Sequence, residues 1–223
     1  MKNVLFIGNS YTYYNDMPKE LFAKMSESVG IETDVRAVTK GGESLRGHQT
    51  EGHETYDAVS DIFEKKKYDV VVLQEQSDRP AIEPEIYLAA LGALVERAKR
   101  SGAECVAYGT WPKQLGHKNL ERFGISKYEM AKMLDATFQR AGEHFGIRVA
   151  YAGKCFAQIE RTAGHIDVYN EDLTHPSYAG SYTAALCILN SAFGVDPETV
   201  TFNGELCAND AQLIRAAVKR VTE

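Results

Sequence analysis

Three residues that lie far apart in the sequence have the chemical types needed for nucleophilic catalysis. Ser10 lies in the segment Gly-Asn-Ser-Tyr-Thr at residues 8–12, and His175 follows Asp172 at a spacing of three residues. A serine hydroxyl becomes a good nucleophile when an imidazole accepts its proton and a carboxylate stabilises the imidazolium. Taken singly, Ser10 fits a turn, Asp172 a helix cap and His175 an ordinary loop. Their positions in the fold must therefore decide between these structural roles and a catalytic one.

The segment before Ser10 predicts where its hydroxyl lies. Residues 4–7 form a short apolar run typical of a buried strand, and Gly8 and Asn9 favour a tight turn. In open α/β sheets, ligands bind at the carboxyl ends of the strands. A serine at such an end, together with an acid–base pair, predicts a serine hydrolase.

Strand-like and helix-like segments alternate along the whole chain, which predicts a single three-layer α/β/α domain over residues 1–223 with a parallel sheet. Two loops that follow predicted strands, residues 40–52 and 110–125, are long enough to suggest a functional role at the same edge as Ser10. The predicted strands are 4–7, 33–38, 70–73, 104–108 and 148–151, and the predicted helices are 18–29, 53–66, 84–101, 126–145, 178–193 and 209–221.

Acyl transfer also needs hydrogen-bond donors aimed at the developing oxyanion. Gly41 and Gly42 follow the second predicted strand, and a glycine there lets backbone N–H groups approach a ligand. Gln74 and Gln76 follow the third strand, where either side chain could supply an amide donor. A plain turn at the glycines and a loop or helix-capping network at the glutamines remain the alternatives.

These segments together resemble the SGNH (GDSL-like) hydrolase superfamily, in a bacterial branch with a Gly-Asn-Ser-Tyr-Thr nucleophile block. The resemblance spans most of the chain, and it implies a five-stranded parallel sheet of flavodoxin-like strand order. The blocks that carry it are, in order, Gly8-Asn9-Ser10, Gly42, Leu-Gln-Glu-Gln-Ser at residues 73–77, Asp172-x-x-His175 and His-Pro-Ser-Tyr-Ala-Gly at residues 175–180.

The resemblance also implies the role of each site residue. Ser10 would be the nucleophile, His175 the base and Asp172 the acid, with the backbone N–H groups of Ser10 and Gly42 as oxyanion donors. Most of the superfamily has Gly-x-Asn where this chain has Gln-Glu-Gln-Ser, which is closer to the Gln-Gly-Glu block of sialate and xylan acetylesterases. The third donor is therefore assigned to Gln74, with Gln76 as the alternate.

Aromatic residues near the predicted edge suggest a substrate surface, since such side chains stack on sugar rings, although they could equally pack the loops. No long apolar stretch suggests a tunnel for a lipid tail. Together with the resemblance, which carries most of this expectation, these features imply small acyl esters, especially acetyl esters on a carbohydrate, with Tyr11, Gln76 and Trp111 contacting the substrate. The aromatic residues in question are Tyr11, Tyr13, Tyr14, Trp111 and Tyr178.

Two alternative functions remain open at this point. A thioesterase or lysophospholipase-type acyl hydrolase would use the same acyl-enzyme and differ only in leaving group and acceptor. A non-catalytic, flavodoxin-like binder could instead hold a phosphate or flavin at the turn of residues 8–12. Such a binder gives no reason for Asp172 and His175.

Composition argues against several other classes of protein. The 223 residues are 44% hydrophobic and 25% charged, and the net charge of −6 disfavours a nucleic-acid partner. The four cysteines lack metal-binding spacing, so we expect no metal and no cofactor. No apolar stretch has the roughly 20 residues of a membrane span, and residues 1–3 lead directly into the first strand, which favours a cytoplasmic location. The cysteines are Cys105, Cys155, Cys187 and Cys207.

Overall fold

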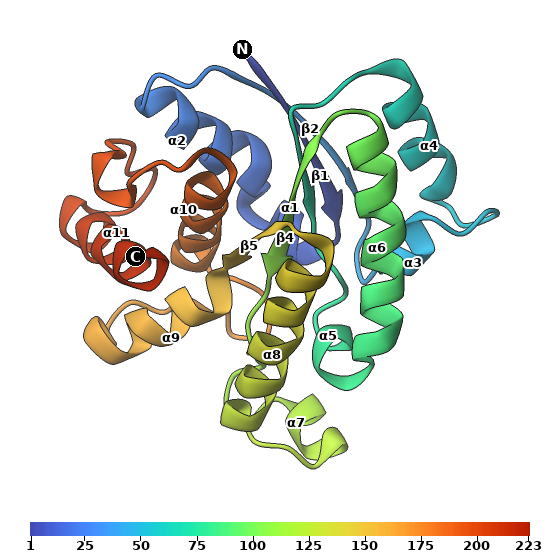
Figure 1. Ribbon diagram of the computed structural model, residues 1–223. Helices are drawn as coiled ribbons and strands as arrows, with labels where there is room; N and C mark the ends of the chain where they lie inside the picture. Colours follow the sequence, from blue (N-terminus) through green and yellow to red (C-terminus); the bar gives the residue numbers. More distant parts are fainter.

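The computed structural model, which describes residues 1–223, contains a five-stranded parallel sheet between two layers of helices (Figure 1). The strand order is β2-β1-β3-β4-β5, which is the flavodoxin-like order. Both the predicted α/β class and the predicted strand order are therefore confirmed. The strands are β1 (Lys2–Gly8), β2 (Thr33–Thr39), β3 (Val70–Leu73), β4 (Glu104–Gly109) and β5 (Arg148–Tyr151).

Successive strand side chains enter two separate cores, because they point alternately to the two faces of the sheet. In β1, Val4 and Phe6 belong to one core, and Leu5 and Ile7 belong to the other. The first core is covered by the π-helix Met17–Phe22 and by four α-helices. These are α2 (Ala23–Ser28), α9 (Ala152–Thr162), α10 (Tyr178–Phe193) and α11 (Ala208–Thr222). The second is covered mainly by α4 (Tyr56–Lys65), α6 (Pro84–Arg100) and α8 (Lys127–Phe145).

The long predicted helices are present within a few residues of their predicted ends, but α9 was not predicted. Its N-cap residue, Tyr151, makes no side-chain capping hydrogen bond, so the usual start signal is absent. Gly153 in its first turn lowers helix propensity, yet a Cβ there would lie 2.5 Å from the carbonyl oxygen of Thr110. The glycine is therefore needed for the close approach of α9 to the end of β4.

The two long predicted loops contain short helices. Residues 40–52 include α3 (Leu45–His48), and residues 110–125 include α7 (Lys118–Phe123). Two further short helices, α1 (Ser10–Tyr13) and α5 (Arg79–Ile82), were not predicted either, because a single turn leaves no periodic pattern to detect. None of the helices in this fold has both the length and the apolar character required to span a membrane.

Candidate active site

Ser10, His175 and Asp172 form one continuous chain of hydrogen bonds. The Oγ atom of Ser10 lies 2.9 Å from Nε2 of His175. The Nδ1 atom of His175 lies 2.5 Å from Oδ2 of Asp172. With the carboxylate accepting the Nδ1 proton, Nε2 is left as an acceptor for the serine hydroxyl. This tautomer is the one in which the imidazole can remove the hydroxyl proton.

Asp172 also organises the backbone of the loop that carries the histidine. Its Oδ1 atom accepts hydrogen bonds from the backbone N–H groups of Thr174 and His175, at 3.0 and 2.9 Å. The tight turn requires Leu173 to adopt a φ of +63°, a left-handed conformation that is rare for leucine. Partial burial raises the pKa of Asp172, but the hydrogen bonds from His175 and the two backbone groups lower it by more. Its net pKa is therefore below the ordinary value.

Two tyrosines hold the imidazole ring of His175. Tyr14 stacks on it with a centroid separation of 4.3 Å and an interplanar angle of 4°. Tyr11 meets the same ring edge-on at 5.7 Å. The flat contact with Tyr14 leaves the ring few alternative orientations while both of its nitrogen atoms remain in their hydrogen bonds. Tyr14 is therefore part of the site through its contact with the His175 imidazole, a contact that the sequence did not single out.

The turn that presents Ser10 depends on Asn9 and Gly8. The side chain of Asn9 accepts a hydrogen bond from the backbone N–H of Tyr11 and so caps α1, while its amide donates to the carbonyl oxygen of Glu43. This second bond joins the turn that carries Ser10 to the glycine-rich loop after β2. A Cβ on Gly8 would lie 2.5 Å from Oγ1 of Thr12 and 2.6 Å from Oε1 of Gln74, so only glycine fits.

The assignment of the third oxyanion donor to Gln74 is wrong in this structure. The side chain is 0% exposed and lies beneath the nucleophile turn. Its Oε1 atom accepts from the backbone N–H of Asn9 and from the hydroxyl of Thr12, at 2.8 and 2.9 Å, and its amide donates to the carbonyl oxygen of Glu75. Gln74 is therefore a structural support for the turn, and its amide is already occupied.

Gln76, the alternate donor, lies in the pocket that contains Ser10. Its Oε1 atom accepts from the backbone N–H groups of Asp78 and Arg79, which fixes the side chain. Its Nε2 atom has only a long contact of 3.4 Å with Oγ of Ser77, so the amide can still donate to another group. The backbone N–H groups of Ser10 and Gly42 likewise make no hydrogen bond within the protein, and both residues line the same pocket.

The prediction that Trp111 contacts the substrate is contradicted by its burial. The indole is 0% exposed and lies between the rings of Tyr11 and Phe156, with centroid separations of 4.6 and 4.2 Å. Its Nε1 donates to the carbonyl oxygen of Thr174 at 3.0 Å. Trp111 therefore supports the histidine loop from behind. Tyr11 does line the pocket, but its hydroxyl is engaged with Thr174.

The pocket beside Ser10, called the Ser10 pocket below, is small and polar. Its volume is about 280 Å³, and only one of the 13 residues that line it is hydrophobic. The sequence did not single out the residues that come from the loop after β4, and their only signal was the length of that loop. Those residues are Lys113, His117, Lys118 and Asn119.

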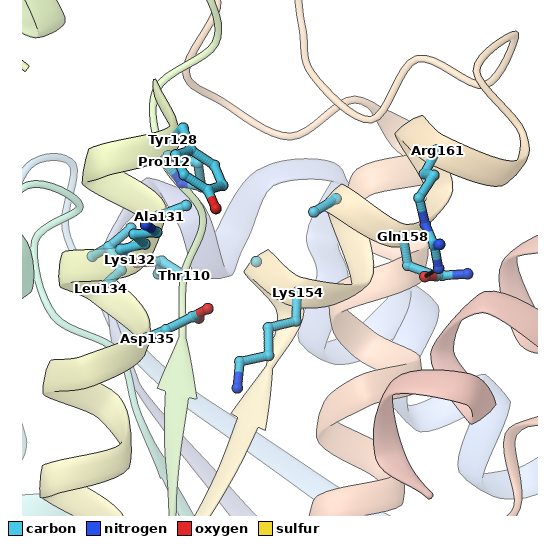
Figure 2. A pocket seen from close by; sticks show the side chains of 12 residues that line it. Thr110, Pro112, Tyr128, Ala131, Lys132, Leu134, Asp135, Lys154, Gln158 and Arg161 are labelled. Atoms are coloured by element: carbon cyan, nitrogen blue, oxygen red, sulfur yellow. Dashed lines mark hydrogen bonds between the residues drawn. The ribbon is translucent and has the colours of Figure 1, made fainter. Parts of the chain in front are cut away.

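A second pocket, called the α8–α9 pocket below, lies between α8 and α9 near the ends of β4 and β5 and has a volume of about 420 Å³. Figure 2 shows the carboxylate of Asp135 and the ammonium of Lys154 extending into it, with Tyr128 at its upper rim in this view. Its lining contains no serine, cysteine or histidine. The larger of these two pockets therefore lacks both a serine or cysteine nucleophile and a histidine base.

Comparisons with known proteins bear on the fold and the family. No family model matches the chain, and no curated protein does. Among solved structures, the chain is similar to a protein from Slackia heliotrinireducens that is described as an SGNH hydrolase. The identity is 31%, the match covers 85% of this chain and 98% of that one, and the TM-score is 0.75.

Two further solved structures share the fold at lower identity. A DUF4886 family protein from Bacteroides uniformis is 19% identical, with 99% of this chain and 94% of that chain covered and a TM-score of 0.82. A variant of an acetyl-xylooligosaccharide esterase from Geobacillus is 18% identical, with 86% and 94% covered and a TM-score of 0.58. At these identities the likeness concerns the fold alone.

Proposed function

The chain belongs to the SGNH superfamily of ester-bond hydrolases, and from this premise we propose that it is a serine esterase that acts through a Ser10 acyl-enzyme on small acyl esters. The observation that carries the proposal is the hydrogen-bond chain from Ser10 through His175 to Asp172. These three hydrogen-bonded side chains lie at the carboxyl edge of the parallel sheet, where ligands bind in open α/β folds.

Acylation begins when the Oγ atom of Ser10 attacks the ester carbonyl carbon and its proton passes to Nε2 of His175. The lowered pKa of Asp172 keeps its carboxylate ionised, so it stabilises the imidazolium that forms. The tetrahedral intermediate then collapses, the bond to the alcohol breaks, and the imidazolium returns its proton to the departing alkoxide. The products of this half-reaction are the free alcohol and the acyl-Ser10 ester.

The negative charge on the tetrahedral intermediate needs donors that are placed before the reaction starts. We assign this role to the backbone N–H groups of Ser10 and Gly42 and to Nε2 of Gln76. All three residues line the Ser10 pocket, and none of the three donors is used in a short hydrogen bond elsewhere in the protein. Each such donor contributes about 10²–10³-fold to kcat in other acyl-transfer enzymes.

Deacylation reverses the same proton transfers. His175 removes a proton from a water molecule, the hydroxide attacks the acyl carbon, and the Oγ atom of Ser10 leaves with the proton held by the imidazolium. The acid is released and the starting hydrogen-bond chain is restored. Because the acylated enzyme exists apart from the alcohol, the kinetics with varied ester and acceptor alcohol should be ping-pong.

The size and polarity of the Ser10 pocket support a short acyl group. A volume of about 280 Å³ with a single hydrophobic lining residue offers little apolar surface to an alkyl chain. The acetyl group is therefore the favoured acyl group, and the polar lining is compatible with a carbohydrate as the alcohol. The likeness in fold to an acetyl-xylooligosaccharide esterase is consistent with this substrate class. A lysophospholipase, or a thioesterase for long acyl chains, would need more apolar surface.

The proposal is tested by covalent labelling followed by substrate profiling. An organophosphonate ester should label the purified protein at Ser10, located by mass spectrometry of the peptide, and should fail to label the His175→Ala variant. Hydrolysis of p-nitrophenyl acetate should exceed that of the octanoate ester, and acetylated xylooligosaccharides should release acetate. Absence of labelling in the parent protein would exclude the acyl-enzyme, whereas a preference for octanoate would overturn only the substrate class.

A further inference from the structure

Lys113 is a buried lysine that takes no part in the acylation and deacylation steps proposed above. The residue is 4% exposed, and its ammonium lies among four oxygen atoms. The distances from Nζ are 3.0 Å to the hydroxyl of Tyr11, 2.8 Å to that of Ser77, 2.5 Å to that of Thr174 and 3.2 Å to Oδ1 of Asp78. An ammonium has three N–H donors, so these partners occupy it fully.

The partners of this lysine are significant because of their places in the sequence. Each of the three hydroxyl groups belongs to a residue directly next to one that we propose to carry the reaction. Tyr11 follows the nucleophile Ser10, Ser77 follows the oxyanion donor Gln76, and Thr174 precedes the base His175. Three segments that are distant in the chain therefore meet at one nitrogen atom.

The charge of Lys113 is compensated inside the protein. Burial lowers its pKa, but the neighbouring Tyr11 and Asp78 raise it by more, so the net pKa is above the ordinary value and the ammonium is charged at neutral pH. Asp78 is itself fixed, because its Oδ2 atom accepts a hydrogen bond of 2.6 Å from the amide of Asn119. With its donors occupied and its charge paired, Lys113 is suited to holding protein groups rather than substrate.

The backbone around Lys113 is anchored in part by Tyr169 and Phe156, which lie outside the catalytic segments. The preceding carbonyl oxygen, of Pro112, accepts a hydrogen bond of 2.9 Å from the hydroxyl of Tyr169. Trp111, two residues earlier, is packed between Tyr11 and Phe156. The lysine side chain therefore extends from a fixed point, and its ammonium can impose a position on the three hydroxyl groups that it contacts.

We propose that Lys113 is a positioning residue that sets the relative placement of the nucleophile, the base and the third oxyanion donor. The proposal rests on the esterase function argued above. Rate depends steeply on such placement, since a displacement of about 1 Å can cost on the order of 10²-fold. Binding of the ester depends on it much less, so the effect should fall on kcat and leave KM nearly unchanged.

The test combines two variants, because a single loss of the lysine leaves the Asp78 carboxylate buried without its partner. The double variant Lys113→Met/Asp78→Asn removes both charges and keeps the side-chain volumes. We expect its kcat for p-nitrophenyl acetate to fall on the order of 10²-fold with KM within about twofold. Labelling of Ser10 by the organophosphonate should slow to a similar extent. A folded double variant with parental kcat would overturn the proposal.

Thr174→Val provides a second variant that should fold in any case, since it replaces one hydroxyl by a methyl group of similar size. It removes one of the three hydroxyl contacts of Lys113, together with the hydrogen bond between the Thr174 and Tyr11 hydroxyls, and keeps the backbone bond from Thr174 to Asp172. We expect kcat to fall about tenfold at unchanged KM, and an unchanged kcat would again contradict the proposal.

Lys66→Met is the matched control for loss of a lysine ion pair. Its ammonium lies 2.5 Å from Oδ2 of Asp34, outside the Ser10 pocket, so its loss should leave kcat unchanged. Failure of the esterase proposal itself would appear separately, as absence of labelling and turnover in the parent protein.

Discussion

The Ser10 pocket and the α8–α9 pocket share one segment of chain but differ in how their walls are connected. The Ser10 pocket is the smaller, at about 280 Å³ against about 420 Å³. Its walls come from the ends of β1, β2, β3 and β4 and from the histidine loop. Side-chain hydrogen bonds join these segments to one another. The α8–α9 pocket is lined mainly by two helices. The arrangement of Ser10, His175 and Asp172 therefore depends on the hydrogen bonds between these segments. The larger volume of the α8–α9 pocket does not indicate such an arrangement.

The shared segment, residues 110–113, separates the two pockets by the alternation of its side chains. Thr110 and Pro112 line the α8–α9 pocket. Trp111 and Lys113 lie on the other side, where they contact Tyr11 and Thr174. An extended backbone directs successive side chains to opposite sides. One short stretch of chain can therefore support the catalytic groups on one side and form a passive wall on the other.

The largest difference between the pockets should appear when the nucleophile is removed. Ser10→Ala deletes the atom that attacks the ester, so we expect kcat to fall by roughly 10⁵-fold or more. Ser28→Ala, which removes a hydroxyl at the end of α2, is the matched control and should keep full activity. Steady-state hydrolysis of p-nitrophenyl acetate measures both. Substantial residual turnover in Ser10→Ala would show that catalysis occurs somewhere other than the Ser10 pocket.

The next largest effect should distinguish the two glutamines that follow β3. Gln76→Ala removes a donor to the oxyanion, so kcat should fall about 10²-fold. Its melting temperature should fall less than that of Gln74→Ala, because Gln76 is only half-buried and water can replace its oxygen as the acceptor for Asp78 and Arg79. Gln74→Ala should instead lower the melting temperature, because the backbone N–H of Asn9 and the hydroxyl of Thr12 lose their buried acceptor. Kinetics and thermal unfolding of both variants provide the comparison. The reverse pattern would return the donor role to Gln74.

The sequence predicted the sheet and the placement of Ser10 because both follow from the topology of the sheet. Apolar runs such as Val70–Leu73 mark strands covered on both faces, and parallel strands bring all their carboxyl ends to one edge. Residues that follow different strands must then be neighbours. Short-range spacing also set the Asp172–His175 pair, since a turn of three residues brings carboxylate and imidazole together.

The two predictions that failed depended on contacts with elements that the sequence did not show. Trp111 could face solvent or the core, and the choice was made by Phe156 on α9, a helix without a side-chain cap. Gln74 and Gln76 have the same chemistry, and which of them faces the pocket depends on how the chain leaves β3. Lys113 lies in a long loop, so nothing local indicated its partners.

A smaller effect concerns stability. Burial raises the pKa of one carboxyl group at each pocket, that of Glu75 beside the Ser10 pocket and that of Asp135 in the α8–α9 pocket. Burial raises the pKa of Glu75, next to Gln76, to about 7, even though backbone N–H groups donate to it. The folded state therefore keeps this proton to a higher pH than the unfolded state does. The resulting cost is absent below about pH 4.5 and complete above about pH 7, so stability falls as the pH rises through this range.

Glu75→Gln should remove this pH dependence while keeping an oxygen that can accept from Leu45 and Gln76. The total difference is on the order of 3 kcal/mol, which follows from the rise of the pKa of Glu75 from 4.5 to about 7. Denaturant unfolding of both proteins at about pH 4 and about pH 8 measures it. Parallel loss of stability in the variant and the parent would mean that another group is responsible.

The smallest expected effect tests whether the α8–α9 pocket is passive in catalysis. Asp135 and Lys154 lie beyond the shared segment, on helices that contribute nothing to the Ser10 pocket. Asp135→Asn and Lys154→Met should therefore leave kcat and KM for p-nitrophenyl acetate within about twofold, as expected for sites without shared partners. A loss of tenfold or more would mean that the wall formed by Thr110 and Pro112 transmits strain to Lys113. The two pockets would then be one functional unit, and the contrast drawn between them would fail.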